Sequence, residues 1–298
     1  MKFPSITTII SHMVAGSLAS AVLTLGLGVL YWPQTQAAPA PVVAEQAVWP
    51  KPLSFDGALL TARAAVVYDP VSGAVLFSKN ARETLPLASL TKLMSAEAVL
   101  TRTEQKSRVT ITPNDLAPEG DWNFILGESW SIGDLLRFGL VASSNDAMAA
   151  AASALGVDPA EVMNSEAQTL GLEQSYFLNP TGLDVDLTTA GGYGSAIDIA
   201  RLAGVFVREY PELFAATVAP SITIGYGERA LTADSTAAPL LTIPGLLGAK
   251  TGFTDLAGGN LVAAFDLELG RPVIIAVLGS TREGRFEDVK KLLNALRN

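Results

Sequence analysis

NLVAAFDL (260–267) and VIIAVL (273–278) are two β-rich runs with five residues between them. A connection this short cannot form a parallel crossover, so the two strands are predicted to pair in antiparallel fashion. Near the start of the chain, 64–68 and 74–78 are also β-rich, and the segment DPVSG (69–73) between them has the composition of a hairpin turn. Strands from both ends of the chain are therefore predicted to join one sheet, which is largely antiparallel.

Helical sequence fills the interval between these strands. Helices are predicted over 89–100, from Ser131 onward, and over 145–155, 159–170 and 195–207. Short strands are predicted at 222–224 and 248–251, and the apolar spacing over 286–296 predicts a final amphipathic helix that covers the sheet. The fold class is therefore α+β: a largely antiparallel sheet built from N- and C-terminal strands, flanked by helices, with an inserted helical lobe.

The composition excludes several classes of function. The chain has 298 residues, 49% of them hydrophobic, which is enough for a large core. The net charge of −9 argues against nucleic acid as a partner. There is no cysteine, and the one histidine, His12, lies beside an apolar N-terminal run, so a Ser-His-Asp triad or a histidine zinc site is excluded. Hydrolytic chemistry would need a hydroxyl nucleophile with a base other than imidazole, and no metal or other cofactor is expected.

The N-terminus has the pattern of a targeting segment. Lys2 is the only charged residue before Glu45, and 14–32 is a run of uncharged, mostly apolar residues. Small residues near Ala37 and Ala38 then indicate a secretory signal over 1–38. The run is nearly long enough to span a bilayer, so the alternative is an uncleaved anchor that associates with the membrane through 14–32. In either case the rest of the chain is exported, and the proline-containing stretch 39–56 is a linker.

The first motif that carries chemistry is Ser89-Leu90-Thr91-Lys92. At the start of a helix, Ser89 and Lys92 share one face and come within hydrogen-bond reach. The positive end of the helix dipole would lower the pKa of Lys92, and a neutral amine can accept the hydroxyl proton. The pair is therefore a candidate nucleophile and base that needs no histidine.

Two further motifs supply polar groups. In Ser143-Ser144-Asn145, at a junction between helices, Ser143 could relay protons and the carboxamide of Asn145 could hold a peptide group. The other motif is Lys250-Thr251-Gly252, in the strand predicted at 248–251. Lys250 supplies positive charge, Thr251 supplies a hydroxyl for a carboxylate, and Gly252 allows a ligand to approach the strand closely.

With their flanks, these motifs resemble those of the low-molecular-mass penicillin-binding proteins, the serine D-alanyl-D-alanine carboxypeptidases and endopeptidases. The resemblance covers about 64–297 and includes PLASLTKLM (86–94), SSNDA (143–147), NPTGLD (179–184) and GAKTGFT (248–254). It implies a penicillin-binding domain over 57–298, located in the periplasm or at the outer face of the bacterial cytoplasmic membrane. Peptidoglycan stem peptides would be the substrates, and β-lactams would be covalent inhibitors.

The resemblance also implies roles for individual residues. Ser89 would form an acyl-enzyme, with Lys92 as base, Ser143 as proton relay and Asn145 as holder of the substrate amide. Lys250 and Thr251 would bind the terminal carboxylate, and Lys250 would help to keep Lys92 neutral by repulsion. The backbone N–H groups of Ser89 and Phe253 would form the oxyanion hole, with Phe253 acting through its backbone only. The 179–184 stretch is interpreted as a turn beneath the site.

Several activities remain open at this point. The carboxypeptidase reading is preferred, whereas the compact chain and the KTGFT stretch (250–254) are similar to the endopeptidase branch. A class A β-lactamase shares the motifs but needs a carboxylate for deacylation, and its Glu-x-x-x-Asn pattern has no clear match between Ser143 and Lys250. A non-catalytic wall-binding module that kept the fold is the third alternative, against which the intact Ser89 and Lys92 argue.

Overall fold

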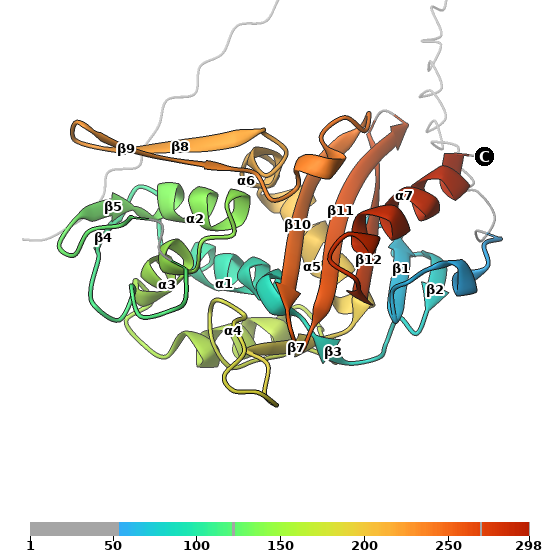
Figure 1. Ribbon diagram of the computed structural model, residues 1–298, viewed down its shortest axis with the longest axis horizontal. Coiled ribbons are helices and arrows are strands. Elements are labelled where there is room, and N and C mark those ends of the chain that lie inside the picture. The colour runs from blue at the N-terminus through green and yellow to red at the C-terminus, as the bar shows by residue number, and fades with distance from the viewer. Residues whose placement is uncertain (1–53, 121–122, 269, 298) are drawn as a thin grey trace, which may run out of the picture. The chain divides into compact units, whose positions relative to one another are not determined.

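The structure is a computed structural model that describes residues 54–120, 123–268 and 270–297 (Figure 1). The expected signal or anchor segment 1–38 lies outside these residues, as does the linker up to residue 53. Within the described part of the chain, no helix is both long and apolar enough to cross a bilayer.

The main sheet has five strands in the order β10-β11-β12-β1-β2, and every neighbouring pair is antiparallel. Its strands are β1 Ala64–Tyr68, β2 Val75–Lys79, β10 Leu246–Thr254, β11 Gly258–Glu268 and β12 Arg271–Ser280. The first strand pairs with the last, with Val66 opposite Ala276. The predicted joining of N- and C-terminal strands is therefore confirmed.

Both faces of this sheet are covered, and the alternation of side chains along each strand shows it. In β1, Ala65 and Val67 belong to the apolar cluster that includes Leu292 and Leu293 of α7 (Gly284–Arg297). The alternate residues of β1 face a second cluster, which includes the buried side of α5 (Ala196–Glu209). Figure 1 shows α7 and α5 on opposite faces of the sheet. The final helix thus covers the sheet, as its apolar spacing predicts.

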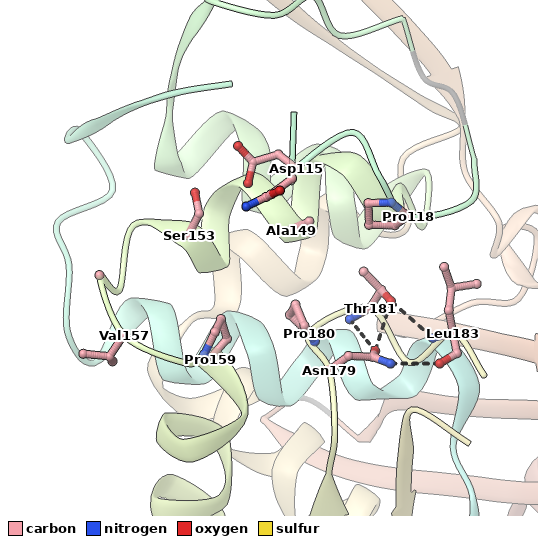
Figure 2. A pocket seen from close by; sticks show the side chains of 12 residues that line it. Asp115, Pro118, Ala149, Ser153, Val157, Pro159, Asn179, Pro180, Thr181 and Leu183 are labelled. Carbon is pink, nitrogen blue, oxygen red and sulfur yellow. Dashed lines mark hydrogen bonds between the residues drawn. The ribbon is translucent and has the colours of Figure 1, made fainter. Parts of the chain in front are cut away.

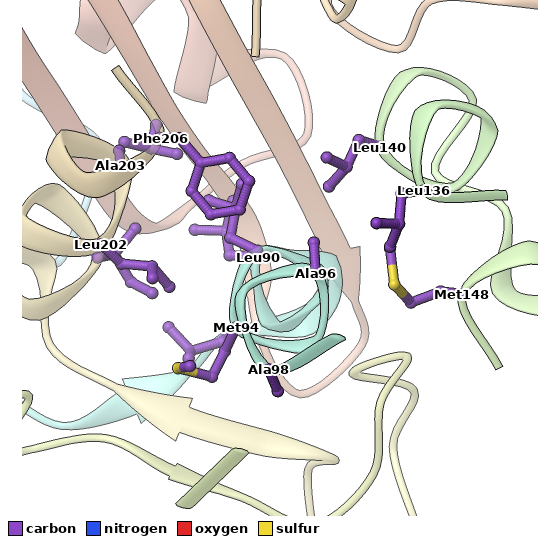
Figure 3. Packing of buried hydrophobic residues seen from close by; sticks show 14 of the residues in the cluster. Leu90, Met94, Ala96, Ala98, Leu136, Leu140, Met148, Leu202, Ala203 and Phe206 are labelled. Carbon is purple, nitrogen blue, oxygen red and sulfur yellow. The ribbon is translucent and has the colours of Figure 1, made fainter. Parts of the chain in front are cut away.

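The helical lobe is built around one buried helix. Its elements are α1 Thr91–Leu100, α2 Ile132–Val141, α3 Asn145–Ser153, α4 Pro159–Thr169 and α6 Pro211–Ala216. In Figure 3, α1 lies between α5, which contributes Leu202 and Phe206, and α2, which contributes Leu136 and Leu140. Every residue of α1 from Thr91 to Val99 is buried. This helix is therefore held rigidly from several sides, and the 3₁₀ turn Ala88–Leu90 leads into it.

The structure also contains short elements that the sequence did not predict. These are β3 Leu85–Pro86, β4 Arg108–Thr110, β5 Ser129–Ser131, β6 Tyr176–Phe177, β7 Gly192–Gly194, β9 Arg229–Asp234, helix α6, and the 3₁₀ turns Gly57–Leu59 and Ala238–Leu240. The strand expected at 222–224 is β8 Ser221–Tyr226, which pairs with β9 in a hairpin of its own, apart from the main sheet. The helix expected from Ser89 begins at Thr91, because Ala88–Leu90 is a 3₁₀ turn in which Ala88 has a positive φ of 49°.

Candidate active site

Ser89 lies in the 3₁₀ turn before α1, and Lys92 lies in the first turn of that helix. The Nζ atom of Lys92 is 2.9 Å from the Oγ atom of Ser89. Ala88, directly before Ser89, has a left-handed backbone conformation that is uncommon for a residue with a side chain. Local strain of this kind is often found next to reactive groups and persists because the surrounding packing imposes it.

Lys92 is fully buried, and burial lowers its pKa from 10.5 to about 7. The structure gives desolvation of the amine as the cause, which was not among those expected from the sequence, the helix dipole and repulsion by Lys250. Lys92 Nζ donates to three oxygens, those of Ser89 Oγ at 2.9 Å, Asn145 Oδ1 at 2.7 Å and the carbonyl of Thr181 at 2.6 Å. Near neutral pH a substantial fraction of this amine is therefore uncharged and able to accept a proton.

The carbonyl of Thr181 belongs to the turn that the sequence placed beneath the site. Asn179 shapes this turn, because its Oδ1 accepts from the N–H groups of Thr181 and Gly182 at 3.1 and 2.8 Å. Gly182 has a φ of 78°, and a Cβ at this position would lie 2.0 Å from the Ala88 carbonyl oxygen. The turn was expected, but its contact with Lys92 was missed because a backbone carbonyl has no residue-type signal.

The same turn lines an open groove of about 580 Å³ (Figure 2). Pro180, Thr181 and Leu183 form one side of this groove. Across from them in Figure 2 lie Ala149, which belongs to α3, and Pro118, which belongs to the loop before β5. The groove therefore adjoins the residue that contacts Lys92.

The loop between α2 and α3 carries Ser143 and Asn145. The Ser144 hydroxyl caps α3 by accepting from the Ala147 N–H at 3.1 Å, while Ser143 has a positive φ of 60°. Asn145 accepts from Lys92 through Oδ1 and donates through Nδ2 to the Glu119 carbonyl. The predicted junction between two helices is therefore the element that brings this loop to α1.

Strand β10 supplies the wall of the site that contacts the Ser143 loop. Lys250 is buried, and its Nζ donates to Ser143 Oγ at 2.7 Å and to its neighbour's carbonyl, that of Thr251, at 2.8 Å. Its pKa is lowered well below the ordinary value by burial, and further by the charges of Lys92 and Arg285. The Thr251 hydroxyl donates to the hydroxyl of Thr236 at 2.8 Å.

Gly252 lies against the turn that holds Ser89. A Cβ on Gly252 would be 2.8 Å from the Leu87 carbonyl oxygen and 3.2 Å from the Ser89 nitrogen, so only glycine allows this approach. From α7, Arg285 donates to the Gly252 carbonyl at 2.7 Å. The guanidinium of Arg282 lies 3.7 Å from the ring centroid of Phe253. Neither arginine was found from the sequence: α7, which carries Arg285, was interpreted only as a cover for the sheet, and Arg282 lies in the segment just before it.

The structure thus brings the three motifs into one place. Direct hydrogen bonds join Ser89, Lys92 and Asn145, and another joins Ser143 to Lys250, while Gly252 packs against the Ser89 turn. Among the described residues, there is no group of three or more His, Cys, Asp or Glu side chains that could hold a metal ion. A hydroxyl beside an uncharged amine, close to a second lysine and a carboxamide, can perform acyl transfer.

Comparison with known proteins agrees with this geometry. Residues 52–282 match the sequence model of a family described as D-alanyl-D-alanine carboxypeptidase. D-alanyl-D-alanine carboxypeptidase DacA of Haemophilus influenzae is 32% identical over 251 residues, covering 78% of this chain and 61% of that protein. A D-alanyl-D-alanine endopeptidase of Pseudomonas aeruginosa is 31% identical, covering 78% of this chain and 76% of that protein.

A solved structure is similar over its whole length. Penicillin-binding protein D2 of Listeria monocytogenes, in its ampicillin-bound form, has a TM-score of 0.72 and 32% identity. The match covers 82% of this chain and 100% of that one. The curated carboxypeptidases are longer, and the chain spans about 61% of DacF of Bacillus subtilis, to which it is 28% identical with 78% of its own residues covered.

Proposed function

The chain belongs to the D-alanyl-D-alanine carboxypeptidase family, as its motifs predict, and from this premise we propose that it is a serine-type D-Ala-D-Ala carboxypeptidase. The observation that carries the proposal is the buried Lys92 amine, with a pKa of about 7, at 2.9 Å from Ser89 Oγ. A base whose pKa lies close to the working pH is the most effective one for removing a hydroxyl proton.

Substrate binding would use the charges on β10. The stem peptide ends in a D-alanine carboxylate, which Lys250 and Thr251 would bind through the ammonium group and the hydroxyl. Asn145 would hold the peptide group before the scissile bond through its carboxamide. The scissile carbonyl would then lie against Ser89, with its oxygen between the N–H groups of Ser89 and Phe253.

Acylation would proceed in two proton steps. Neutral Lys92 takes the proton of Ser89 as Oγ forms a bond to the scissile carbonyl carbon, and the negative oxygen is held by the two N–H groups. The C–N bond then breaks, and the leaving D-alanine nitrogen takes a proton from the Ser143 hydroxyl. Lys92 passes the proton it took from Ser89 to Ser143 and becomes neutral again. Lys250 supports this relay, since its Nζ donates to Ser143 Oγ and leaves the hydroxyl proton free for transfer.

Deacylation would use the same base. Lys92 is neutral again after the relay, so it can take a proton from water as the water oxygen attacks the acyl carbon. The bond to Ser89 Oγ then breaks, and Oγ receives the proton from Lys92. The products are the shortened stem peptide and free D-alanine, and the enzyme returns to its starting state.

The wider setting is part of the same proposal. The catalytic domain would comprise 57–298, and the segment 1–38 would export it to the periplasm or the outer face of the cytoplasmic membrane, with 14–32 as the membrane contact if it is retained. Peptidoglycan stem peptides would be the natural substrates. β-Lactams would acylate Ser89, a reading supported by the ampicillin-bound Listeria relative.

A second candidate is cleavage of peptidoglycan cross-links. The relative in Pseudomonas aeruginosa that is named an endopeptidase favours it, because the alignment covers more of that protein than of the carboxypeptidases. In a cross-link whose amide nitrogen is attached to a carbon of D configuration (a D-centre), that carbon also carries a carboxylate. Lys250 and Thr251 could therefore bind either substrate.

The test compares the two substrates directly. Release of D-alanine from a stem pentapeptide and cleavage of a cross-linked dimer are measured with the wild-type protein and with Ser89→Ala. We expect D-alanine release that the variant lacks. Preferential cleavage of the dimer would favour the endopeptidase, and equal rates for wild type and variant would overturn the proposal.

A further inference from the structure

Thr236 is a residue of the site that none of the three motifs contains. It follows strand β9, and its hydroxyl is 2.8 Å from that of Thr251, the residue assigned above to the substrate carboxylate. Thr251 is 4% exposed and Thr236 is half-buried, so the pair is largely shielded from bulk water. Each hydroxyl has one proton, so each can donate to only one acceptor at a time.

The backbone of Thr236 is held in place from both sides of the site. Its N–H donates at 3.1 Å to the carbonyl of Val141, the last residue of α2, two positions before Ser143. The preceding hydroxyl, that of Ser235, donates to the Thr217 carbonyl at 2.9 Å, and the Thr217 hydroxyl accepts from the Ala249 N–H of β10 at 2.9 Å. Thr236 therefore connects the Ser143 loop to the β10 wall.

In the structure the proton of the Thr251 hydroxyl is used in a hydrogen bond to Thr236. Thr251 donates to Thr236, and the Thr236 hydroxyl donates to the Val141 carbonyl over a long 3.4 Å. A carboxylate has no proton of its own, so Thr251 can hydrogen-bond to it only by turning its proton toward it. Thr251 then needs no acceptor at Thr236, but its own oxygen can accept from Thr236.

The hydrogen bond between Thr251 and Thr236 can reverse its direction without leaving a buried polar group unpaired. The Val141 carbonyl keeps the Thr236 N–H as a donor when the hydroxyl turns away, so no buried acceptor is left without a partner. A hydroxyl that accepts one hydrogen bond becomes a better donor in the next, because the two bonds polarise each other.

We propose that Thr236 is a positioning residue that donates to Thr251 and thereby directs the Thr251 proton to the carboxylate beside the scissile amide. The inference rests on the proposed function and deepens it, since it names what the site selects: a substrate with a free carboxylate on its leaving group. Both D-Ala-D-Ala ends and cross-links to a D-centre meet this condition, whereas an amide or ester at that position does not.

The test is the preference for the free acid over its uncharged analogue. Thr236→Val removes the hydroxyl and keeps the shape of the side chain, and Thr236→Ser restores a hydroxyl. For each protein, kcat and KM are measured with a D-Ala-D-Ala peptide and with its C-terminal amide. A second readout is the rate of acylation by benzylpenicillin and by its methyl ester.

We expect Thr236→Val to reduce the preference for the free acid about tenfold, mainly through KM, and Thr236→Ser to retain most of it. The matched control is Thr223→Val, which removes the same group from the exposed hydroxyl pair Thr223–Thr232 of the β8–β9 hairpin, where the two oxygens are also 2.8 Å apart. Thr223→Val should leave the preference unchanged.

Other results would overturn the role. An unchanged preference in Thr236→Val, or equal losses with the acid and the amide, would mean that Thr236 only supports the fold. A serine variant that behaves like the valine variant would contradict the donor role. A wild-type protein that neither cleaves the peptide nor is acylated would instead overturn the proposed function, and the role of Thr236 with it.

Discussion

The Nζ atom of Lys92 lies 2.9 Å from the Oγ atom of Ser89 while the lysine side chain has no exposed surface. Burial disfavours the charged form of this amine and lowers its pKa from 10.5 to about 7, while Nζ lies within hydrogen-bond distance of three oxygens. The amine can therefore exchange a proton with Ser89 at neutral pH without a histidine.

Replacing the proposed base should abolish acylation. We expect Lys92→Ala to reduce the rate of acylation by benzylpenicillin by about 10³-fold or more, since no other described side chain is hydrogen-bonded to Ser89 Oγ. The control is Lys106→Ala, because the Lys106 side chain is 86% exposed and forms its ion pair with Glu104, on the surface. Full labelling of the Lys92 variant would disprove the base role.

The acylation rate should depend on pH with an inflection near neutrality. Lys92 must be neutral to accept the proton, and its pKa is about 7. The second-order rate of acylation should therefore rise about tenfold per pH unit below 7 and stop rising at that slope above 7. Stopped-flow measurements between pH 5 and 9 would show this. A rate that stays constant down to pH 5 would contradict a base with this pKa.

Gly182 should be intolerant of a side chain. A Cβ there would lie 2.0 Å from the Ala88 carbonyl oxygen, directly before Ser89, so Gly182→Ala should displace the turn that carries Ser89. We expect a loss of about 2–3 kcal/mol in the free energy of unfolding, together with slower acylation. Gly156→Ala is the control, because Gly156 has a similar positive φ of 68° but no atom within 4 Å of the added Cβ.

The control should lose only about 1 kcal/mol for its left-handed backbone and keep its acylation rate. Chemical denaturation of both variants separates the two costs. Equal losses in stability and equal acylation rates would show that the contact with Ala88 has no influence on the site.

Glu97 should make stability depend on pH. Burial, with Glu166 and Glu209 nearby, raises its pKa from 4.5 to about 7. Between these values the folded state binds more protons than the unfolded state, so this group's contribution to stability falls as the pH rises from 4.5 to 7. Glu97→Gln should remove that fall, and its melting temperature relative to wild type should be higher at pH 8 than at pH 5. A constant difference across this range would contradict the shift.

The main sheet could be predicted because its strands are long and consistently apolar. The runs 260–267 and 273–278 lie within β11 and β12, where side chains are buried on both faces, so nearly every position is constrained. Two-residue strands such as β3 and β6 are too short to show any periodicity. Strand β9 consists of Arg229–Asp234, in which polar residues hide its pairing with β8.

The site was predictable only where the residue type carries the chemistry. Ser89, Lys92 and Lys250 have reactive or charged side chains in recognisable motifs. The contact from Thr181 is made by a backbone carbonyl, which any residue could supply. Arg285 reaches Gly252 from a helix 33 positions later, and such a contact depends on how α7 packs against the sheet.

The acyl-enzyme on Ser89 is the central claim, and intact mass spectrometry after incubation with benzylpenicillin tests it most directly. Ring opening expels no atoms, so the account predicts a lasting increase equal to the whole mass of the drug, which peptide mapping places on Ser89 and which Ser89→Ala lacks. Hydrolysis of the drug without a lasting adduct would indicate a β-lactamase. A protein that shows neither adduct nor hydrolysis would contradict the account and identify a catalytically silent member of the family.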